Sequence, residues 1–268
     1  MSGEHPSTSE TLTHAANSPV MRAITVSRTY GSGGGEVAAR LARRLNWKLL
    51  DHEMVAQVAH QLGLSAEEAE AKDERVEGFI AHVLNSLSLA YPGYPDITSG
   101  VPPSPADLDH IYQEALSQVI LAAAHHGHAV IVGRGAFALL AGRRDVLRVE
   151  VVAPLEQRVL YVARREGLDD RAARERIRRK DQDRQRHIET HYHIRPGTPE
   201  LYDVTVNTAV LTLDDAVELI CLALERKGQR LSVPDEELGP GAGMPRYPAA
   251  PGDIALPLAG RDNDHSGR

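Results

Sequence analysis

The chain has 268 residues, of which 42% are hydrophobic and 25% charged, and this ordinary globular composition excludes wholesale disorder and collagen-like repeats. No apolar run reaches the roughly 18 residues of a membrane helix, and the first twenty residues lack a basic, apolar leader. The net charge of −7 and the aromatic content of 4% argue against nucleic-acid binding. The single cysteine excludes an internal disulfide. We therefore expect a soluble, cytoplasmic protein that binds neither nucleic acid nor membranes.

Both ends of the chain are expected to be disordered tails. Residues 1–20 have no periodic apolar pattern, and residues 231–268 are crowded with Pro and Gly. Between them, the predicted domain at 21–230 alternates short β-branched runs with amphipathic helical patterns, the runs being Ala23–Ser27, Lys48–Leu50, Ala129–Val132, Leu147–Val152 and Val204–Val206. This alternation predicts an α/β fold with a parallel sheet of about five strands covered on both faces. The range 52–127 has helical patterns and no convincing strand, and is expected to be a helical insertion.

A glycine-rich loop joins the first predicted strand to the first predicted helix, and it reads R-T-Y-G-S-G-G-G-E from Arg28 to Glu36. Such a loop directs backbone N–H groups and a helix N-terminus at an anion, for which phosphate is the natural ligand. The Walker pattern G-x-x-x-x-G-K-[ST] is incomplete, because its lysine and its hydroxyl are missing. A flexible glycine turn without a ligand remains the alternative at this point. The candidate phosphate contacts are Gly31, Ser32, Gly33, Gly34, Gly35 and Glu36.

An arginine-rich segment follows the fourth predicted strand. Residues 158–186 hold eleven basic and six acidic residues, a local net charge of +5 in an acidic chain. On a helix that starts near Asp169, Arg179, Asp183 and Arg186 are spaced i, i+4, i+7 and share one face. Two guanidiniums can grip phosphate oxygens while the carboxylate accepts from a sugar hydroxyl. The pattern predicts a lid over a phosphate site, and a solvated surface helix is the alternative.

The order of these motifs resembles the cytidylate kinase-like family, a branch of the P-loop nucleoside monophosphate kinases. The resemblance rests on the glycine loop, Gly133-Arg134-Gly135 after a strand, the arginine helix, and Tyr202–Thr208, and it covers about residues 22–227. It implies a three-layer α/β/α P-loop fold with a helical nucleotide-binding insertion at 52–127 and an arginine-rich lid at 167–195. It also implies ATP and Mg²⁺ as cofactors. The loop lysine is typically missing from this branch, and Arg28 is the candidate that replaces its charge.

The same resemblance implies roles for single residues. Glu36 stands where the magnesium-binding hydroxyl would be, so it is either a Mg²⁺ ligand or a favourable acid in the first turn of a helix. Arg134 corresponds to the acceptor-phosphate arginine of a Gly-Arg-Asp motif, although Gly135 removes the acid. Asp51 begins the acceptor-binding segment, although the Ser-Gly and Tyr-Arg that should follow are absent.

The lid of cytidylate kinases, R-x-x-x-D-x-x-R, matches Arg179, Asp183 and Arg186, with Asp183 expected to contact the acceptor. Asn207 and Thr208 are expected near the adenine of the donor, or in a simple turn that ends a strand. His187, His191 and His193 show no zinc-hydrolase pattern, so no zinc site is predicted there.

The sequence supports a hypothesis of a kinase, a monomer or homodimer, that moves the γ-phosphoryl group of ATP to CMP, dCMP or a related small phosphorylated acceptor. Its catalytic candidates are Arg28, Arg134, Arg179, Asp183 and Arg186. The first alternative is a nucleotide-binding sensor with little or no catalysis, because the lysine is missing and the acceptor loop is altered. The second, less favoured, is a nucleic-acid-binding protein that uses the arginine helix.

Overall fold

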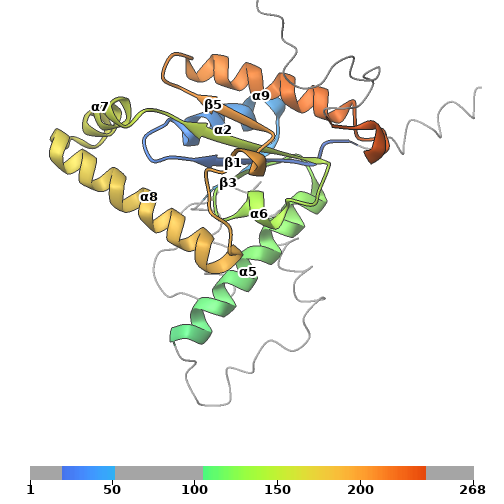
Figure 1. Cartoon of the computed structure of the whole chain (residues 1–268), viewed down its shortest axis with the longest axis horizontal. Helices are drawn as coiled ribbons and strands as arrows, with labels where there is room; N and C mark the ends of the chain where they lie inside the picture. Colours follow the sequence, from blue (N-terminus) through green and yellow to red (C-terminus); the bar gives the residue numbers. More distant parts are fainter. Residues whose placement is uncertain (1–19, 52–104, 240–268) are drawn as a thin grey trace, which may run out of the picture. The chain divides into compact units, whose positions relative to one another are not determined.

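A computed structural model describes residues 20–51 and 105–239 (Figure 1). Most of the predicted helical insertion and of the two predicted tails lies outside the described residues. The described end of the insertion is helix α5 (Pro105–His126). A separate small unit begins at Ser232 and holds the short 3-10 helix η3 (Asp235–Glu237).

Five parallel strands form one sheet in the order β2-β3-β1-β4-β5, as the alternating sequence pattern predicted. The strands are β1 (Ala23–Arg28), β2 (Lys48–Leu50), β3 (Ala129–Val132), β4 (Val146–Val152) and β5 (Val204–Asn207). Successive side chains point to opposite faces of a strand, so Ile24 and Val26 pack in one core cluster while Ala23 packs in the other. Because the strands are parallel, their carboxyl ends meet at one edge, where ligands of such sheets bind.

Helices cover both faces of this sheet. On one face, α2 (Gly34–Leu45) and α9 (Leu213–Gly228) share an apolar cluster with β1, β3, β4 and β5. On the other, α5 and the short α6 (Ala136–Leu139) pack with β1, β2 and β3. The arrangement is a three-layer α/β/α fold (Figure 1). None of the helices in the described ranges is long and apolar enough to cross a membrane.

Helices α7 (Leu155–Glu166) and α8 (Asp170–Tyr192) form a pair that packs through its own apolar cluster. Gly167 ends α7 in the left-handed conformation, with φ at 65°. Asp169 then caps α8 by accepting a hydrogen bond from the Ala172 N–H at 2.7 Å. The helix predicted to begin after Gly167 is therefore present. A 3-10 turn, η2 (Pro199–Leu201), leads from α8 to β5.

Candidate functional site

The glycine loop adopts a backbone that only glycine accommodates at two positions. Gly31 and Gly33 have φ angles of 84° and 78°. A Cβ at Gly31 would lie 2.8 Å from Val162 Cγ2, and one at Gly33 would lie 2.8 Å from Leu213 Cδ2. These glycines let α7 and α9 approach the loop closely. The hydroxyl of Ser32 is buried and donates to the backbone oxygens of Thr29 and Val151, so it holds the loop in shape.

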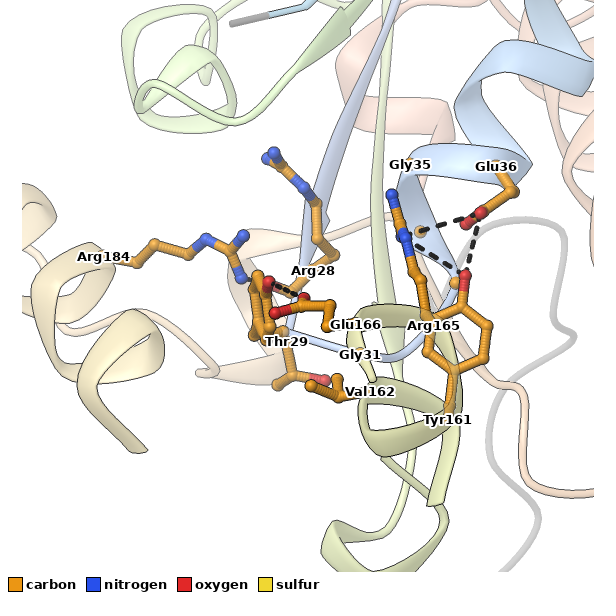
Figure 2. Close-up of a pocket in the computed structure, with 13 residues that line it drawn as sticks. Arg28, Thr29, Gly31, Gly35, Glu36, Tyr161, Val162, Arg165, Glu166 and Arg184 are labelled. Atoms are coloured by element: carbon orange, nitrogen blue, oxygen red, sulfur yellow. Dashed lines mark hydrogen bonds and ion pairs between the residues drawn. The ribbon is translucent and has the colours of Figure 1, made fainter. Parts of the chain in front are cut away.

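Two cavities open at the carboxyl edge of the sheet, on either side of Arg28. The loop cavity, of about 210 Å³, lies beside the glycine loop and the start of α2, with α7 opposite (Figure 2). The strand-end cavity, of about 480 Å³, lies between the ends of β1, β3 and β4 and helix α8. Arg28, Thr29 and Arg184 line both cavities. Two adjacent spaces that share cationic side chains can hold two anionic ligands next to each other.

Arg28 ends β1 and lies largely buried among other arginines. Burial, together with the positive charges of Arg184 and Arg134, lowers the pKa of Arg28 to about 10, while Asp51 at the end of β2 opposes this effect. The Arg28 Nη1 lies against the Gly133 backbone, where any Cβ would overlap it. Burial and like charges disfavour the charged form of Arg28, and a bound phosphate would relieve that penalty. The site is therefore electrostatically suited to an anion.

The turn after β3 carries Arg134 between two glycines. Gly133, Arg134 and Gly135 have φ angles of 74°, 53° and 70°, three consecutive left-handed residues. The Tyr192 hydroxyl, at the end of α8, donates to the Arg134 backbone oxygen at 3.1 Å. A Cβ at position 135 would overlap the Tyr192 ring. The acid of the Gly-Arg-Asp motif has no room here, because the end of α8 occupies its place.

A carboxylate from α8 is bound to the glycine loop. Asp181 accepts the Tyr30 backbone N–H at 2.7 Å and an Arg158 N–H at 2.6 Å, and Arg158 also donates to the Tyr30 oxygen at 3.0 Å. The guanidinium of Arg184 lies 3.6 Å from Asp181 and 5.4 Å from the centroid of the Tyr30 ring. The Tyr30 hydroxyl donates to Glu166 of α7. These contacts fasten the helix pair α7 and α8 to the loop.

The face that α8 turns toward the cavities includes charged residues outside the predicted triad of Arg179, Asp183 and Arg186. Asp181 and Arg184 line the strand-end cavity, and so does Lys180. Asp181 and Arg184 continue the stripe of the buried apolar residues Ala173 and Ile177 at helical spacing. That stripe was the available signal, because the apolar side of a helix identifies which charged residues point inward.

The predicted lid triad is divided between the cavity and solvent. Asp183 lines the strand-end cavity, with 56% of its side chain exposed, and pairs with Arg186 at 3.6 Å. Arg179 and Arg186 are exposed and line neither cavity. The phosphate contacts expected of these two arginines stay predictions.

The other residues expected at the donor site lie near the loop. Asn207 accepts the Ala209 N–H at 3.0 Å, which shapes the turn that ends β5. The Thr208 hydroxyl donates to the Ser32 backbone oxygen at 2.8 Å, so this turn is tied to the glycine loop. Contact with an adenine base stays a prediction for both residues.

Glu36 lies in the first turn of α2 at the rim of the loop cavity. Its Oε1 accepts from the Tyr161 hydroxyl at 2.8 Å and lies 3.6 Å from Arg165 Nη1. Magnesium in phosphoryl-transfer sites takes one or two protein carboxylates, with water and phosphate oxygens as the other ligands. A single carboxylate beside a phosphate loop fits that need. Within residues 20–51 and 105–239, no three or more His, Cys, Asp and Glu side chains lie together in a way that could hold a metal ion. His187 and His191 therefore belong to no such group.

Comparisons with known proteins agree with this geometry. Residues 23–210 match the model of the cytidylate kinase-like family. The chain is 30% identical over 111 residues to a cytidylate kinase of Methanopyrus kandleri, which covers 38% of this chain and 58% of that protein. It is 32% identical over 98 residues to a uronate isomerase of Corynebacterium glutamicum, covering 37% of this chain and 19% of that protein. The chain therefore spans less than two thirds of either relative.

Among solved structures, that of an uncharacterized protein from Eubacterium ventriosum aligns with a TM-score of 0.56 and 19% identity. The alignment covers 76% of this chain and 98% of that one. At this identity the likeness shows a shared fold.

Proposed function

The chain belongs to the cytidylate kinase-like family, and from this premise we propose that it is an ATP-dependent nucleoside monophosphate kinase. Its acceptor is CMP or dCMP, or a related small phosphorylated compound. The observation that carries the proposal is the pair of cavities that share Arg28, Thr29 and Arg184. Phosphoryl transfer needs a donor and an acceptor held in line, with cations beside the group that moves, and little covalent chemistry from the protein.

In this proposal the donor phosphates occupy the loop cavity and the acceptor phosphate occupies the strand-end cavity. The glycine loop from Gly31 to Gly35 supplies backbone N–H groups to the donor. Arg28 and Arg184 lie between the two ligands and neutralise the charge that develops on the transferred group. Thr29 lies at the same junction, and its buried hydroxyl has no hydrogen-bond partner among the described residues.

The acceptor side of the proposal uses Arg134 for the phosphate, with Asp51 and Asp183 as further contacts. Arg179 and Arg186 would reach phosphate when the lid closes over both ligands and excludes water. Bound Mg²⁺ would neutralise charge on the donor phosphates, and Glu36 is the residue placed to hold it. A nucleotide kinase of this kind would act in the cytoplasm, as a monomer or a homodimer.

The reaction is tested with the purified full chain by coupled detection of ADP, with ATP, Mg²⁺ and each common nucleoside monophosphate in turn. We expect turnover with CMP or dCMP well above the rate of ATP hydrolysis without acceptor. Arg28→Ala should remove most of this turnover. Arg178→Ala is the matched control, because Arg178 lies on the outer face of α8 and pairs with Glu175 at 2.7 Å. Absence of turnover with every acceptor, at high enzyme concentration, would refute the kinase proposal.

A sensor is the second candidate function. The observation that favours it is the Asp181 carboxylate on the Tyr30 N–H, where an anion of the protein itself occupies a donor of the loop. Isothermal titration with ATP and Mg²⁺ separates the two functions. A sensor binds nucleotide without turning it over, whereas a kinase does both.

A further inference from the structure

The end of the glycine loop that opens α2 has no cationic side chain of its own. Gly35 stands where a Walker loop has the lysine that contacts the terminal phosphates. It follows Gly33 and Gly34 and precedes Glu36. The position is open, because no described atom beyond its chain neighbours and the nearby backbone of α2 lies within 4 Å of an ideal Cβ built on Gly35. Donor phosphates bound here would receive no counter-charge from residues 31–36.

Arg165, in the last turn of α7, reaches this end of the loop from outside it. Its Nη1 lies 3.6 Å from Glu36 Oε1 and 3.3 Å from the Tyr161 hydroxyl, and it lines the loop cavity. Figure 2 shows the Arg165 guanidinium beside Gly35 and Glu36, with the Tyr161 ring next to its stem. Arg165 therefore carries its charge to the place that the loop leaves uncharged.

The other two arginines that line the loop cavity are engaged elsewhere. The Arg28 guanidinium points away from Gly35 and lies against Gly133, on the side of the strand-end cavity (Figure 2). The Arg184 guanidinium lies over the Tyr30 ring and beside Asp181. Their positions suit the transferred group and the acceptor, and they leave the start of α2 to Arg165.

We infer that Arg165 is a ligand of the donor's terminal phosphates and supplies, from α7, the cation that the loop lacks at position 35. This inference rests on the proposed donor site. A guanidinium binds two phosphate oxygens at once, and here its central carbon lies 5.9 Å from the centroid of the Tyr161 ring. The pair of Arg165 with Glu36 joins side chains that are 61% and 39% exposed, so it is weak and yields readily to a phosphate. The exchange also releases the Glu36 carboxylate for Mg²⁺.

The first test is titration of the full chain with ATP and Mg²⁺, for the native protein and for Arg165→Ala. Loss of a charge-assisted hydrogen bond to phosphate should raise the Kd for ATP about tenfold to a hundredfold. Arg164→Ala is the control, because it removes an exposed arginine of the same turn of α7 that lines neither cavity, and it should change the Kd less than threefold. The exposed position of Arg165 should leave the melting temperature of Arg165→Ala unchanged.

The second test is rescue at Gly35. A lysine or an arginine introduced there in the Arg165→Ala background should restore ATP affinity to within about threefold of the native protein, because the position is open and would return the cation to the loop. Two results overturn the inference: a Kd for Arg165→Ala within twofold of native, or a loss that neither Gly35→Lys nor Gly35→Arg restores in a folded protein. If the native protein binds no ATP, the proposed function itself fails. Binding without turnover still allows the comparison.

Discussion

The replacement Gly135→Ala tests how the end of α8 shapes the strand-end cavity. Gly135 has a φ of 70°, and a methyl group there would overlap the Tyr192 ring. A left-handed backbone costs an L-residue about 1–2 kcal/mol. Overpacking of a well-packed contact adds about 1–3 kcal/mol. We therefore expect Gly135→Ala to lower the free energy of unfolding by about 2–5 kcal/mol.

A double-mutant cycle with Tyr192→Ala separates the two contributions. Tyr192→Ala alone loses the hydrogen bond to the Arg134 oxygen and the packing of the ring near Phe137 and Ile188. In that background the overlap is gone, so Gly135→Ala should cost only the backbone share of about 1–2 kcal/mol. Urea denaturation at equilibrium measures all four proteins. A cost for Gly135→Ala below about 1 kcal/mol, or one that is the same with and without the Tyr192 ring, would refute the reasoning.

The same geometry bears on the acceptor motif. Gly135→Asp would restore the Gly-Arg-Asp sequence, yet its carboxylate would have to pass through the Tyr192 ring. The acid of that motif and the tyrosine at the end of α8 therefore exclude each other in this fold. In the proposed acceptor site, an acidic contact would have to come from another element, such as Asp183 of α8, which lines the strand-end cavity.

Two further predictions concern charged contacts that hold the site and the sheet. Asp181→Asn should lower the free energy of unfolding by about 2 kcal/mol, since it leaves Arg158, with 12% of its side chain exposed, without a carboxylate. The control Glu175→Gln, on the outer face of α8, should leave the urea midpoint unchanged. Equal effects of the two replacements would contradict this prediction. Burial would raise the pKa of Asp203, but hydrogen bonds, including one from Lys227, outweigh burial and lower it. The stabilisation by Asp203 is therefore complete above the unfolded pKa of about 3.9 and is lost at lower pH. In urea titrations, Asp203→Asn should have a lower free energy of unfolding than the native protein at pH 7, and this difference should shrink below about pH 4. A difference that does not change with pH would contradict the prediction.

The sheet and the glycine loop were predictable because their signals are local. Each strand is a short β-branched run between helical patterns. Helices cover both faces of the sheet, so successive side chains of a strand are buried on opposite faces and the strand must be largely apolar along its length. The loop is recognisable because Gly31 and Gly33 need a backbone that few other residues adopt. Arg134 follows a buried strand and lines the strand-end cavity, while its contact with an acceptor phosphate stays a prediction.

The inward face of α8 was predicted only in part, since Asp183 lines the strand-end cavity but Asp181 was not selected. Arg179, Asp183 and Arg186 satisfy the i, i+4, i+7 spacing, but a helix this rich in charge has several faces that do so. What selects one face is the packing of the apolar stripe that includes Ile177, because it turns Asp181 toward the loop. Charge spacing alone cannot make that choice.

Contacts between distant segments were also beyond reach. Tyr192 fills the place next to Gly135, and Arg165 lies beside Glu36, although each pair is far apart in the chain. Neither residue belongs to a motif, so neither carries a sequence signal of its own. Both contacts arise because α7 and α8 pack back over the carboxyl edge of the sheet (Figure 1).

The cations of the site come from three separate elements of the fold. A Walker lysine belongs to the loop itself, so its charge is in place once the loop has formed. Here the positive charge around the loop cavity comes from Arg28 on β1, Arg165 on α7 and Arg184 on α8. Two of the three belong to the helix pair, which is fastened to the loop through Asp181. If the loop cavity holds the donor phosphates as proposed, the affinity for phosphate would depend on the docking of α7 and α8 as well as on the loop.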